Sequence, residues 1–281
     1  MNVLEKLMHI DRRYIFLMVG LCVLIPLIWP FGLPTYTTKH AQNLFNAIDS
    51  IPSNGQALLL AIDFAPSTAP ELMPMAKAVL RHCFAKNIRV LVLALYAQYT
   101  GMAEMALASV IDEYDVKSGE DYVYLMFVPG YYAVMLSIGE DIHRTFPEDF
   151  YGNPIDSLPM MREIHNYDDI ALVVSVSSTV SPRDWAVYVG TSYHQSIGVG
   201  CTAVSAAEFY AFLQSGQFVG MLGGLKGAAE YESLIEGHGY TKKGVRKVAS
   251  IGMDAQSSVH LMMIVLVIFG NIAFLTLRRR K

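Results

Sequence analysis

Two long apolar runs lie near the ends of the chain. The first, residues 14–32, contains no charged side chain, and the second, residues 259–277, has only His260 and Asn271 as strongly polar members. Each run is long enough to cross a hydrocarbon core of roughly 30 Å as a helix. The pattern therefore predicts a transmembrane helix at each of the two runs.

The first run also has the pattern of a secretory signal peptide, since the basic residues Arg12 and Arg13 come before its apolar part. Cleavage needs small residues after the run, whereas residues 29–34 read Trp-Pro-Phe-Gly-Leu-Pro. Bulky side chains and prolines disfavour a cleavage site. We therefore expect an uncleaved signal anchor.

Between these runs, continuous apolar segments alternate with amphipathic ones. Strands that are buried on both faces of a parallel sheet have this near-continuously apolar character. Five segments are interpreted as such strands: residues 56–64, 88–95, 121–128, 169–175 and 197–202, the last of which is interrupted by glycines. The amphipathic segments between them predict helices. The expected fold class is α/β, with an about five-stranded, mostly parallel Rossmann-like sheet covered by helices on both faces, in one domain over residues 37–255.

Glycines mark the stretch from Ser215 to Ala229. Gly216, Gly220, Gly224 and Ala228 follow one another at intervals of four residues, so on a helix they form one stripe almost without side chains. Glycine costs a helix about 1 kcal/mol relative to alanine, which close packing must offset. The stretch therefore predicts a close backbone contact, either with the protein's own sheet or with a neighbouring subunit.

Asn271 gives a second indication of packing. An amide side chain in hydrocarbon is costly unless it is hydrogen-bonded to another helix. The residue therefore predicts a packed partner, either the first membrane helix or another subunit, and the chain is expected to form a homo- or hetero-oligomer.

Basic residues near the two runs indicate the orientation in the membrane. Three of them precede the first run and only Lys39 follows it closely, whereas basic residues flank the second run on both sides, at 242–247 and 278–281. The first helix usually determines the topology. We therefore expect a two-pass protein of the cell membrane, with the tails 1–13 and 278–281 in the cytoplasm and the central domain extracytoplasmic.

Composition supports membrane association. Of the 281 residues, 53% are apolar and 16% are charged, and the mean hydropathy is +0.35, above the usual profile of soluble proteins. Seven of the 21 Lys and Arg residues lie in the two tails, which leaves 14 basic against 23 acidic residues elsewhere. A domain with this negative charge is not expected to bind nucleic acid.

The cysteines identify no metal site. Neither a Cys-x-x-Cys pair nor a His/Cys ligand spacing occurs, so we expect no metal ion and no cofactor. Cys83 and Cys201 can form a disulfide in an oxidising compartment if the fold brings them together, or each can be a small buried apolar side chain.

Polar residues follow two of the predicted strands. Ligands of an open parallel sheet gather beyond the carboxyl ends of its strands. Asp63 ends the first strand, and Ser67 and Thr68 are placed to cap the next helix, where free N–H groups attract anions. Ser177 and Ser178 follow the fourth strand. These five residues form the predicted ligand-binding set, unless they only satisfy their own turns.

No motif identifies a reaction. The chain lacks the P-loop, the Gly-x-Gly-x-x-Gly fingerprint and the Gly-x-Ser-x-Gly elbow, so no catalytic residue is predicted. The pattern favours a non-catalytic assembly or scaffold subunit of a membrane complex that docks through the glycine stretch. The alternatives are a membrane-anchored ligand-binding or sensing module, or a hydrolase, that uses the strand ends.

Overall fold

The computed structural model describes residues 11–278, so most of the predicted tail 1–13 and of the basic tail 278–281 lies outside the described residues. The chain divides into two compact units. One unit, Thr35–Ala249, contains the sheet, and we call it the sheet unit. The other combines Met1–Pro34 with Ser250–Lys281, and we call it the helical unit.

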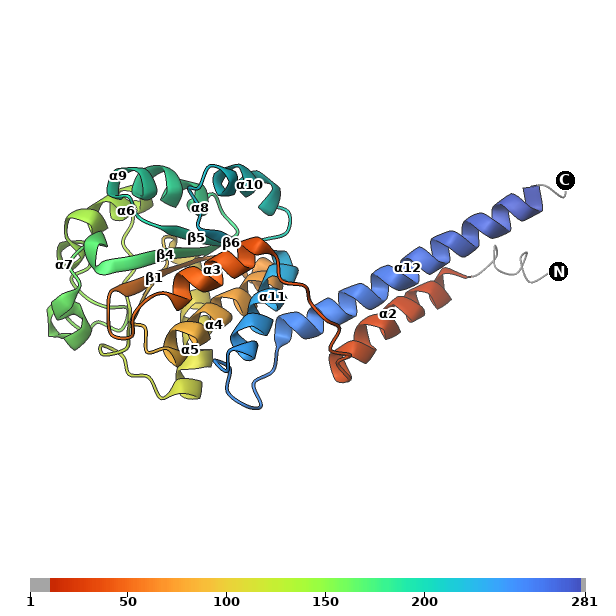
Figure 1. Ribbon diagram of the computed structural model, residues 1–281, viewed down its shortest axis with the longest axis horizontal. Coiled ribbons are helices and arrows are strands. Elements are labelled where there is room, and N and C mark those ends of the chain that lie inside the picture. The colour runs from red at the N-terminus through yellow and green to blue at the C-terminus, as the bar shows by residue number, and fades with distance from the viewer. Residues whose placement is uncertain (1–10, 279–281) are drawn as a thin grey trace. The chain divides into compact units, whose positions relative to one another are not determined.

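Six parallel strands form a single sheet in the order β3-β2-β1-β4-β5-β6 (Figure 1). The prediction of an α/β fold with a parallel, Rossmann-like sheet is therefore confirmed, with one strand more than the five expected. The order reverses between β1 and β4, as in the doubly wound dinucleotide-binding fold. The strands are β1 (Ala57–Asp63), β2 (Val90–Leu93), β3 (Tyr122–Tyr124), β4 (Ile170–Ser177), β5 (Ile197–Cys201) and β6 (Gly220–Gly223).

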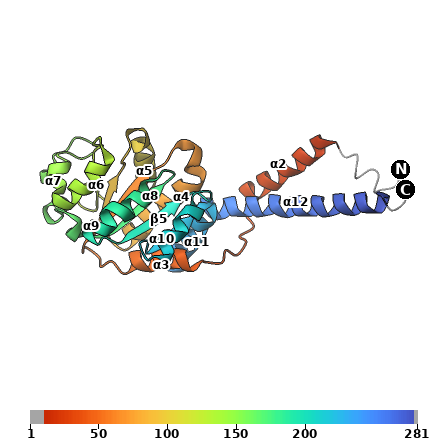
Figure 2. The same ribbon diagram turned by 90° about the horizontal axis from the view of Figure 1, so that it is seen from above.

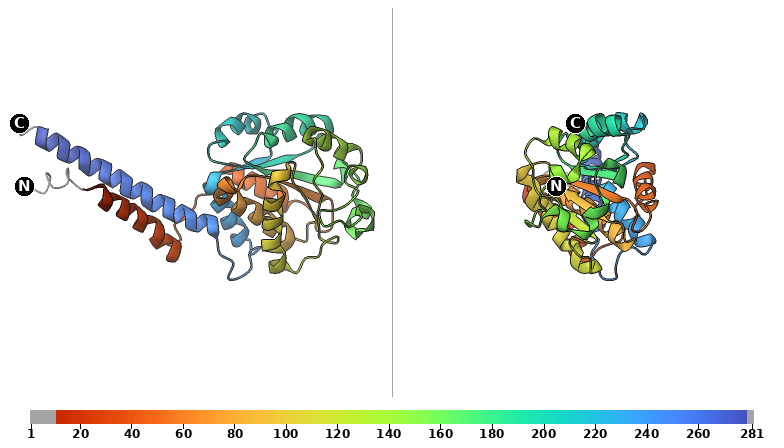
Figure 3. Two further views of the ribbon diagram at one scale, coloured as in Figure 1. Left: turned by 180° about the vertical axis from the view of Figure 1, so that it is seen from behind. Right: turned by 90° about the vertical axis from the view of Figure 1, so that its left-hand side faces the viewer.

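Helices cover both faces of the sheet (Figures 1 and 3). Every residue of β1 is buried, which explains why its sequence is continuously apolar. One face carries α3 (Lys39–Asp49), α4 (Ala69–Ala85), α5 (Thr100–Tyr114) and α11 (Gly224–Gly237). The other carries α6 (Tyr131–Glu140), α7 (Ile142–Thr145), α8 (Ser181–Asp184), the π-helical turn η6 (Trp185–Gly190), α9 (Thr191–Tyr193) and α10 (Ala206–Gln214).

The prediction that Ser215–Ala229 forms one helix with a glycine stripe is wrong. Gly216 and Gly224 have positive φ angles of 77° and 60°, which interrupt a right-handed helix. Between them Gly220 begins β6, and Ala228 lies within α11. A Cβ atom on Gly220 would lie 2.6 Å from the His40 carbonyl oxygen. The four residues therefore do not share one helix: Gly216 lies in a turn, Gly220 in β6, and Gly224 and Ala228 in α11. Gly220 faces the backbone of α3.

A buried polar network joins α3, α4 and α11. The His82 Nδ1 atom lies 2.7 Å from the Tyr231 hydroxyl, and its Nε2 atom lies 3.3 Å from the Asp49 carboxylate, which also accepts a hydrogen bond from Tyr240. Burial lowers the pKa of His82 to about 4. The imidazole is therefore neutral near pH 7, where one nitrogen donates to Asp49 and the other accepts from Tyr231.

The helical unit contains α2 (Arg12–Ile28) and α12 (Val248–Arg278). In the described part of the chain, one helix is long and apolar enough to cross a membrane, at Val248–Thr276 with a mean hydropathy of 2.3. Of the two predicted membrane helices, the C-terminal one meets this criterion, and the one predicted at 14–32, α2, does not. It ends at Ile28 because the prolines that follow cannot continue it, and its 17 residues extend about 26 Å.

An aspartate connects the two segments of the helical unit. The carboxylate of Asp254 on α12 accepts hydrogen bonds from the backbone N–H groups of Phe31, Gly32 and Leu33 at 2.9, 2.8 and 3.1 Å. Gly32 has a φ angle of 65°, which allows these three N–H groups to converge. Beyond this contact the two helices diverge (Figure 2).

Candidate functional site

Three of the five predicted ligand-binding residues meet at the carboxyl edge of the sheet. Asp63 ends β1 and Ser177 ends β4, and the two residues are paired in the parallel register. The Ser177 hydroxyl donates to the Asp63 carbonyl oxygen at 3.0 Å, and the Ser178 N–H donates to the same oxygen at 3.1 Å. They lie where the strand order reverses, which is the usual ligand position of such sheets.

The Asp63 carboxyl group is fully buried. One oxygen accepts from the Leu95 N–H at 2.8 Å, and the other lies 3.4 Å from the Ser181 hydroxyl. Burial raises the pKa of Asp63 to about 7, although these hydrogen bonds oppose the rise. Near neutral pH the group therefore exists in both its protonated and its ionised form.

Hydroxyl groups continue from this carboxyl towards the surface. Ser181 Oγ lies 3.0 Å from Ser177 Oγ, which lies 2.9 Å from Thr179 Oγ1, and a side-chain hydrogen bond links Thr179 to Tyr96. Ser175 lies two residues before Ser177 on β4, on the same face of the sheet. Its buried hydroxyl has no hydrogen-bond partner among the described residues.

Ser67 and Thr68 do not join this group. The Thr68 hydroxyl donates to the Ala65 carbonyl oxygen at 3.0 Å, and no side chain caps α4, so the prediction that Ser67 or Thr68 caps this helix is wrong. The turn Pro66–Thr68 forms a 3-10 helix instead. Pro66 and Pro70 have no N–H group, and the Glu71 carboxylate accepts from the Ala203 N–H nearby. The Thr68 and Ala69 N–H groups are bonded to the Ala65 and Pro66 carbonyl oxygens, so the turn has fewer free N–H groups than the phosphate-binding turn of dinucleotide-binding proteins.

A row of five tyrosines, which sequence reasoning missed, lies beside the hydroxyl groups. Neighbouring ring centroids are 5.7 Å apart for Tyr99 and Tyr96, 5.2 Å for Tyr96 and Tyr131, 3.9 Å for Tyr131 and Tyr132, and 5.1 Å for Tyr132 and Tyr188. Tyr132 and Tyr188 are each 41% exposed. The sequence does contain a signal for this row, since a tyrosine follows each of the second and third predicted strands.

The charged groups near this row are paired. The buried Asp184 carboxylate lies 3.3 Å from the Arg183 guanidinium and accepts a hydrogen bond from the Tyr131 hydroxyl at 3.2 Å.

Cys201, which is paired in register with Ser177, is buried. Burial raises the pKa of its thiol to about 12, so it is a poor nucleophile. Cys83 and Cys201 are both free thiols.

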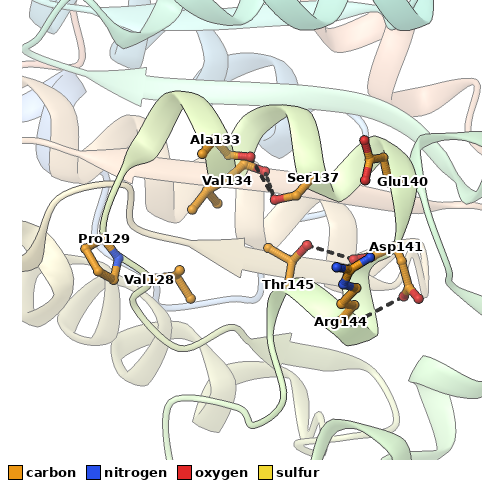
Figure 4. Close-up of a pocket in the computed structure, with 9 residues that line it drawn as sticks. All are labelled: Val128, Pro129, Ala133, Val134, Ser137, Glu140, Asp141, Arg144 and Thr145. Atoms are coloured by element: carbon orange, nitrogen blue, oxygen red, sulfur yellow. Dashed lines mark hydrogen bonds between the residues drawn. The ribbon is translucent and has the colours of Figure 1, made fainter.

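Two cavities of the sheet unit lie outside this group. Figure 4 shows one of about 270 Å³ along α6 and α7, where the hydroxyls of Ser137 and Thr145 bond to carbonyl oxygens of their own helical turns. The other, of about 310 Å³, is lined by residues before β5 and β6, such as Gln195 and Gln217. Neither contains a predicted ligand-binding residue.

Among residues 11–278, no group of three or more His, Cys, Asp or Glu side chains is arranged to hold a metal ion. The fold and the site define an α/β protein with a six-stranded parallel Rossmann-like sheet and one helix that is able to span a membrane. Comparison with known protein families, with curated proteins and with solved structures finds no match to this chain.

Proposed function

We propose that the protein is a membrane-anchored binding module that takes a small polar ligand at the carboxyl edge of the sheet. The observation that carries the proposal is the meeting of Asp63, Ser177 and Ser181 between β1 and β4. Open parallel sheets bind their ligands at this position. A buried hydroxyl without a partner, such as that of Ser175, costs about 1–3 kcal/mol, and a ligand bound at this edge would supply a hydrogen-bond partner.

Binding fits the geometry better than hydrolysis. A nucleophilic serine has to reach its substrate and needs a general base at hydrogen-bonding distance. The Ser177 and Ser181 side chains are fully buried, and Ser181 lies 3.4 Å from the Asp63 carboxyl, a long distance for a proton-accepting contact. The hydrolase alternative therefore has weaker support.

The anchor belongs to the same proposal. Helix α12 crosses the bilayer, and α2 forms the second crossing beside it, held at its end by the contact between Asp254 and the N–H groups of residues 31–33. Arg12 and Arg13 at the start of α2 place that end in the cytoplasm. The protein is then a two-pass protein of the cell membrane, with both termini cytoplasmic and the sheet unit extracytoplasmic.

Equilibrium dialysis tests the binding proposal. The full-length protein in lipid nanodiscs is dialysed against a mixture of neutral, anionic and cationic polar metabolites, and retained compounds are identified by mass spectrometry. We expect at least one compound to be retained by the wild type and its retention to fall about tenfold in Ser177→Ala. Ser137→Ala, which removes a hydroxyl bonded to its own helix, is the matched control.

Two outcomes contradict the proposal. If no compound is retained by the wild type, the binding function is wrong. If a compound is retained equally by the wild type and by Ser177→Ala, the protein binds a ligand, but not at this edge of the sheet.

An assembly function is the second candidate, and Asn271 favours it. Its amide donates to the Val267 carbonyl oxygen of α12 at 2.9 Å, and the side chain is exposed. An amide has further donor and acceptor positions, and another helix is their usual partner in hydrocarbon. Subunits of a homo- or hetero-oligomer would then meet along α12 rather than through the glycine stretch.

Asn271→Leu tests the assembly candidate. We expect the substitution to weaken self-association in nanodisc or micelle cross-linking by about threefold to tenfold, because interhelical hydrogen bonds in membranes contribute about 0.6–1.5 kcal/mol. Thr276→Val is the control, since the Thr276 hydroxyl also bonds to its own helix. Equal cross-linking of Asn271→Leu and the wild type would remove Asn271 from the interface.

A further inference from the structure

We infer that the ligand of this site is a neutral saccharide, whose rings lie on the row of five tyrosines while its hydroxyls reach the partly exposed Ser178 and Thr179 after β4. The inference rests on the proposed binding function and names its ligand class. No sequence motif indicates a saccharide ligand, whereas the arrangement of the side chains does.

The five rings come from segments that follow β2, β3 and β4, and the centroids of neighbouring rings are at most 5.7 Å apart. Tyr132 and Tyr188 lie at one end of the row and keep 41% of their surface exposed. Two neighbouring exposed tyrosines, backed by three partly buried ones, fit a ligand with flat, apolar faces. The C–H faces of sugar rings have this property.

The charged groups around the site favour a neutral ligand. A phosphate or carboxylate ligand needs a free cation or several free N–H groups, but Arg183 is paired with Asp184, and the turn after β1 has two prolines. An ammonium ligand needs a free carboxylate or an aromatic cage with negative potential. Asp184 and Glu71 already have partners, and Asp63 is buried. The pairing of the charged groups favours a neutral ligand.

Ser178 and Thr179 after β4 are partly exposed and carry hydroxyls, each of which can both donate and accept. Tyr96 links the tyrosine row to Thr179, and the buried Ser177 hydroxyl bonds to Thr179 and fixes its position. Sugar hydroxyls also donate and accept, so the two sets are complementary without a net charge on either side. Ligand sites combine aromatic side chains with a few polar groups in this way.

Binding of defined oligosaccharides tests the inference. Full-length protein in nanodiscs is titrated calorimetrically with maltohexaose, cellohexaose and chitohexaose, and with ADP and phosphocholine as charged probes. Nanodiscs are used because maltoside detergents carry the sugar under test. We expect at least one hexasaccharide to bind and both charged probes to bind at least tenfold more weakly.

Substitutions locate the binding surface. We expect Tyr132→Ala to weaken hexasaccharide binding about tenfold and Tyr132→Phe, which keeps the ring, to stay within about twofold of the wild type. Tyr151→Ala is the control, because Tyr151 is 49% exposed and lies outside the row. Tyr188→Ala gives a second variant if Tyr132→Ala does not fold, as judged by thermal unfolding.

The outcomes separate the two proposals. If no hexasaccharide binds, or if binding is the same in Tyr132→Ala, Tyr188→Ala and the wild type, the saccharide inference is wrong. The binding function still stands in that case if dialysis yields another compound that Ser177→Ala loses. Stronger binding of ADP or phosphocholine than of every hexasaccharide would also overturn the inference, and would assign the site to a charged ligand.

Discussion

Gly220→Ala is expected to destabilise the sheet unit by about 3 kcal/mol, although only one methyl group is added. A Cβ atom at this position would lie 2.6 Å from the His40 carbonyl oxygen and 2.8 Å from Leu44 Cα. Both atoms belong to the backbone of α3, so they cannot rotate away as a flexible side chain would. Either α3 moves off the edge of the sheet or β6 separates from β5. Chemical or thermal unfolding of the full-length protein measures the loss.

Gly101→Ala is the matched control. Gly101 lies in α5 and nothing lies within 4 Å of its added Cβ atom, so alanine is expected to stabilise the protein by up to about 1 kcal/mol. Equal stability of Gly220→Ala and the wild type would contradict the packing of α3 on β6. It would also restore the interpretation in which Gly220 lies on a helix surface that is free to meet a partner.

The glycine stretch shows what sequence periodicity misses. Four of the five predicted strands have four or more consecutive apolar residues, as is typical of strands buried on both faces, and the fifth, 197–202, is interrupted only by glycines. The sixth strand, Gly220–Gly223, has glycine at both ends, and glycine is depleted in strands. The close approach of α3 explains the glycine at position 220, since a Cβ atom there would clash with the α3 backbone. This contact joins residues that are nearly 180 positions apart in the chain, so no local pattern records it.

Part of the candidate site could be predicted from the sequence, because its residues follow predicted strands. Asp63 and Ser177 each end a parallel strand, and all carboxyl ends lie at one edge. Their direct pairing depends on β1 lying next to β4, which the sequence does not specify. The tyrosine row depends further on the position of the segments after β2 and β3. Thr68 shows the opposite case, because a local capping pattern is present but the hydroxyl bonds back to Ala65.

Asp63→Asn is expected to stabilise the protein by about 4 kcal/mol at pH 8 and to have little effect near pH 4. The pKa of Asp63 is raised from 3.8 to about 7 by burial, so the folded state binds the proton more tightly than the unfolded state does. The stability that this group contributes is present below pH 3.8 and is lost as the pH rises through about 7. A difference of about three pKa units corresponds to about 4 kcal/mol.

Asparagine fits the site as the protonated carboxyl does. Its carbonyl oxygen accepts from the Leu95 N–H, and its amide donates to the Ser181 hydroxyl, in place of the contacts that Asp63 makes. Unfolding of Asp63→Asn and the wild type is compared at pH 4, 6 and 8. The low pKa of His82 makes both proteins lose stability as the pH falls from 6.5 towards 4, so the difference between them at each pH is the quantity that reports on Asp63.

Asp112→Asn controls for the loss of one negative charge, since Asp112 is exposed. If Asp63→Asn is less stable than the wild type at pH 8, the folded state must stabilise the ionised carboxylate, and the raised pKa of Asp63 is wrong. If it is more stable, Asp63 lowers the stability of the fold at neutral pH, as its raised pKa requires. Under the proposed binding function the stabilised variant should also bind the ligand more weakly, because stability and activity often trade off at such sites.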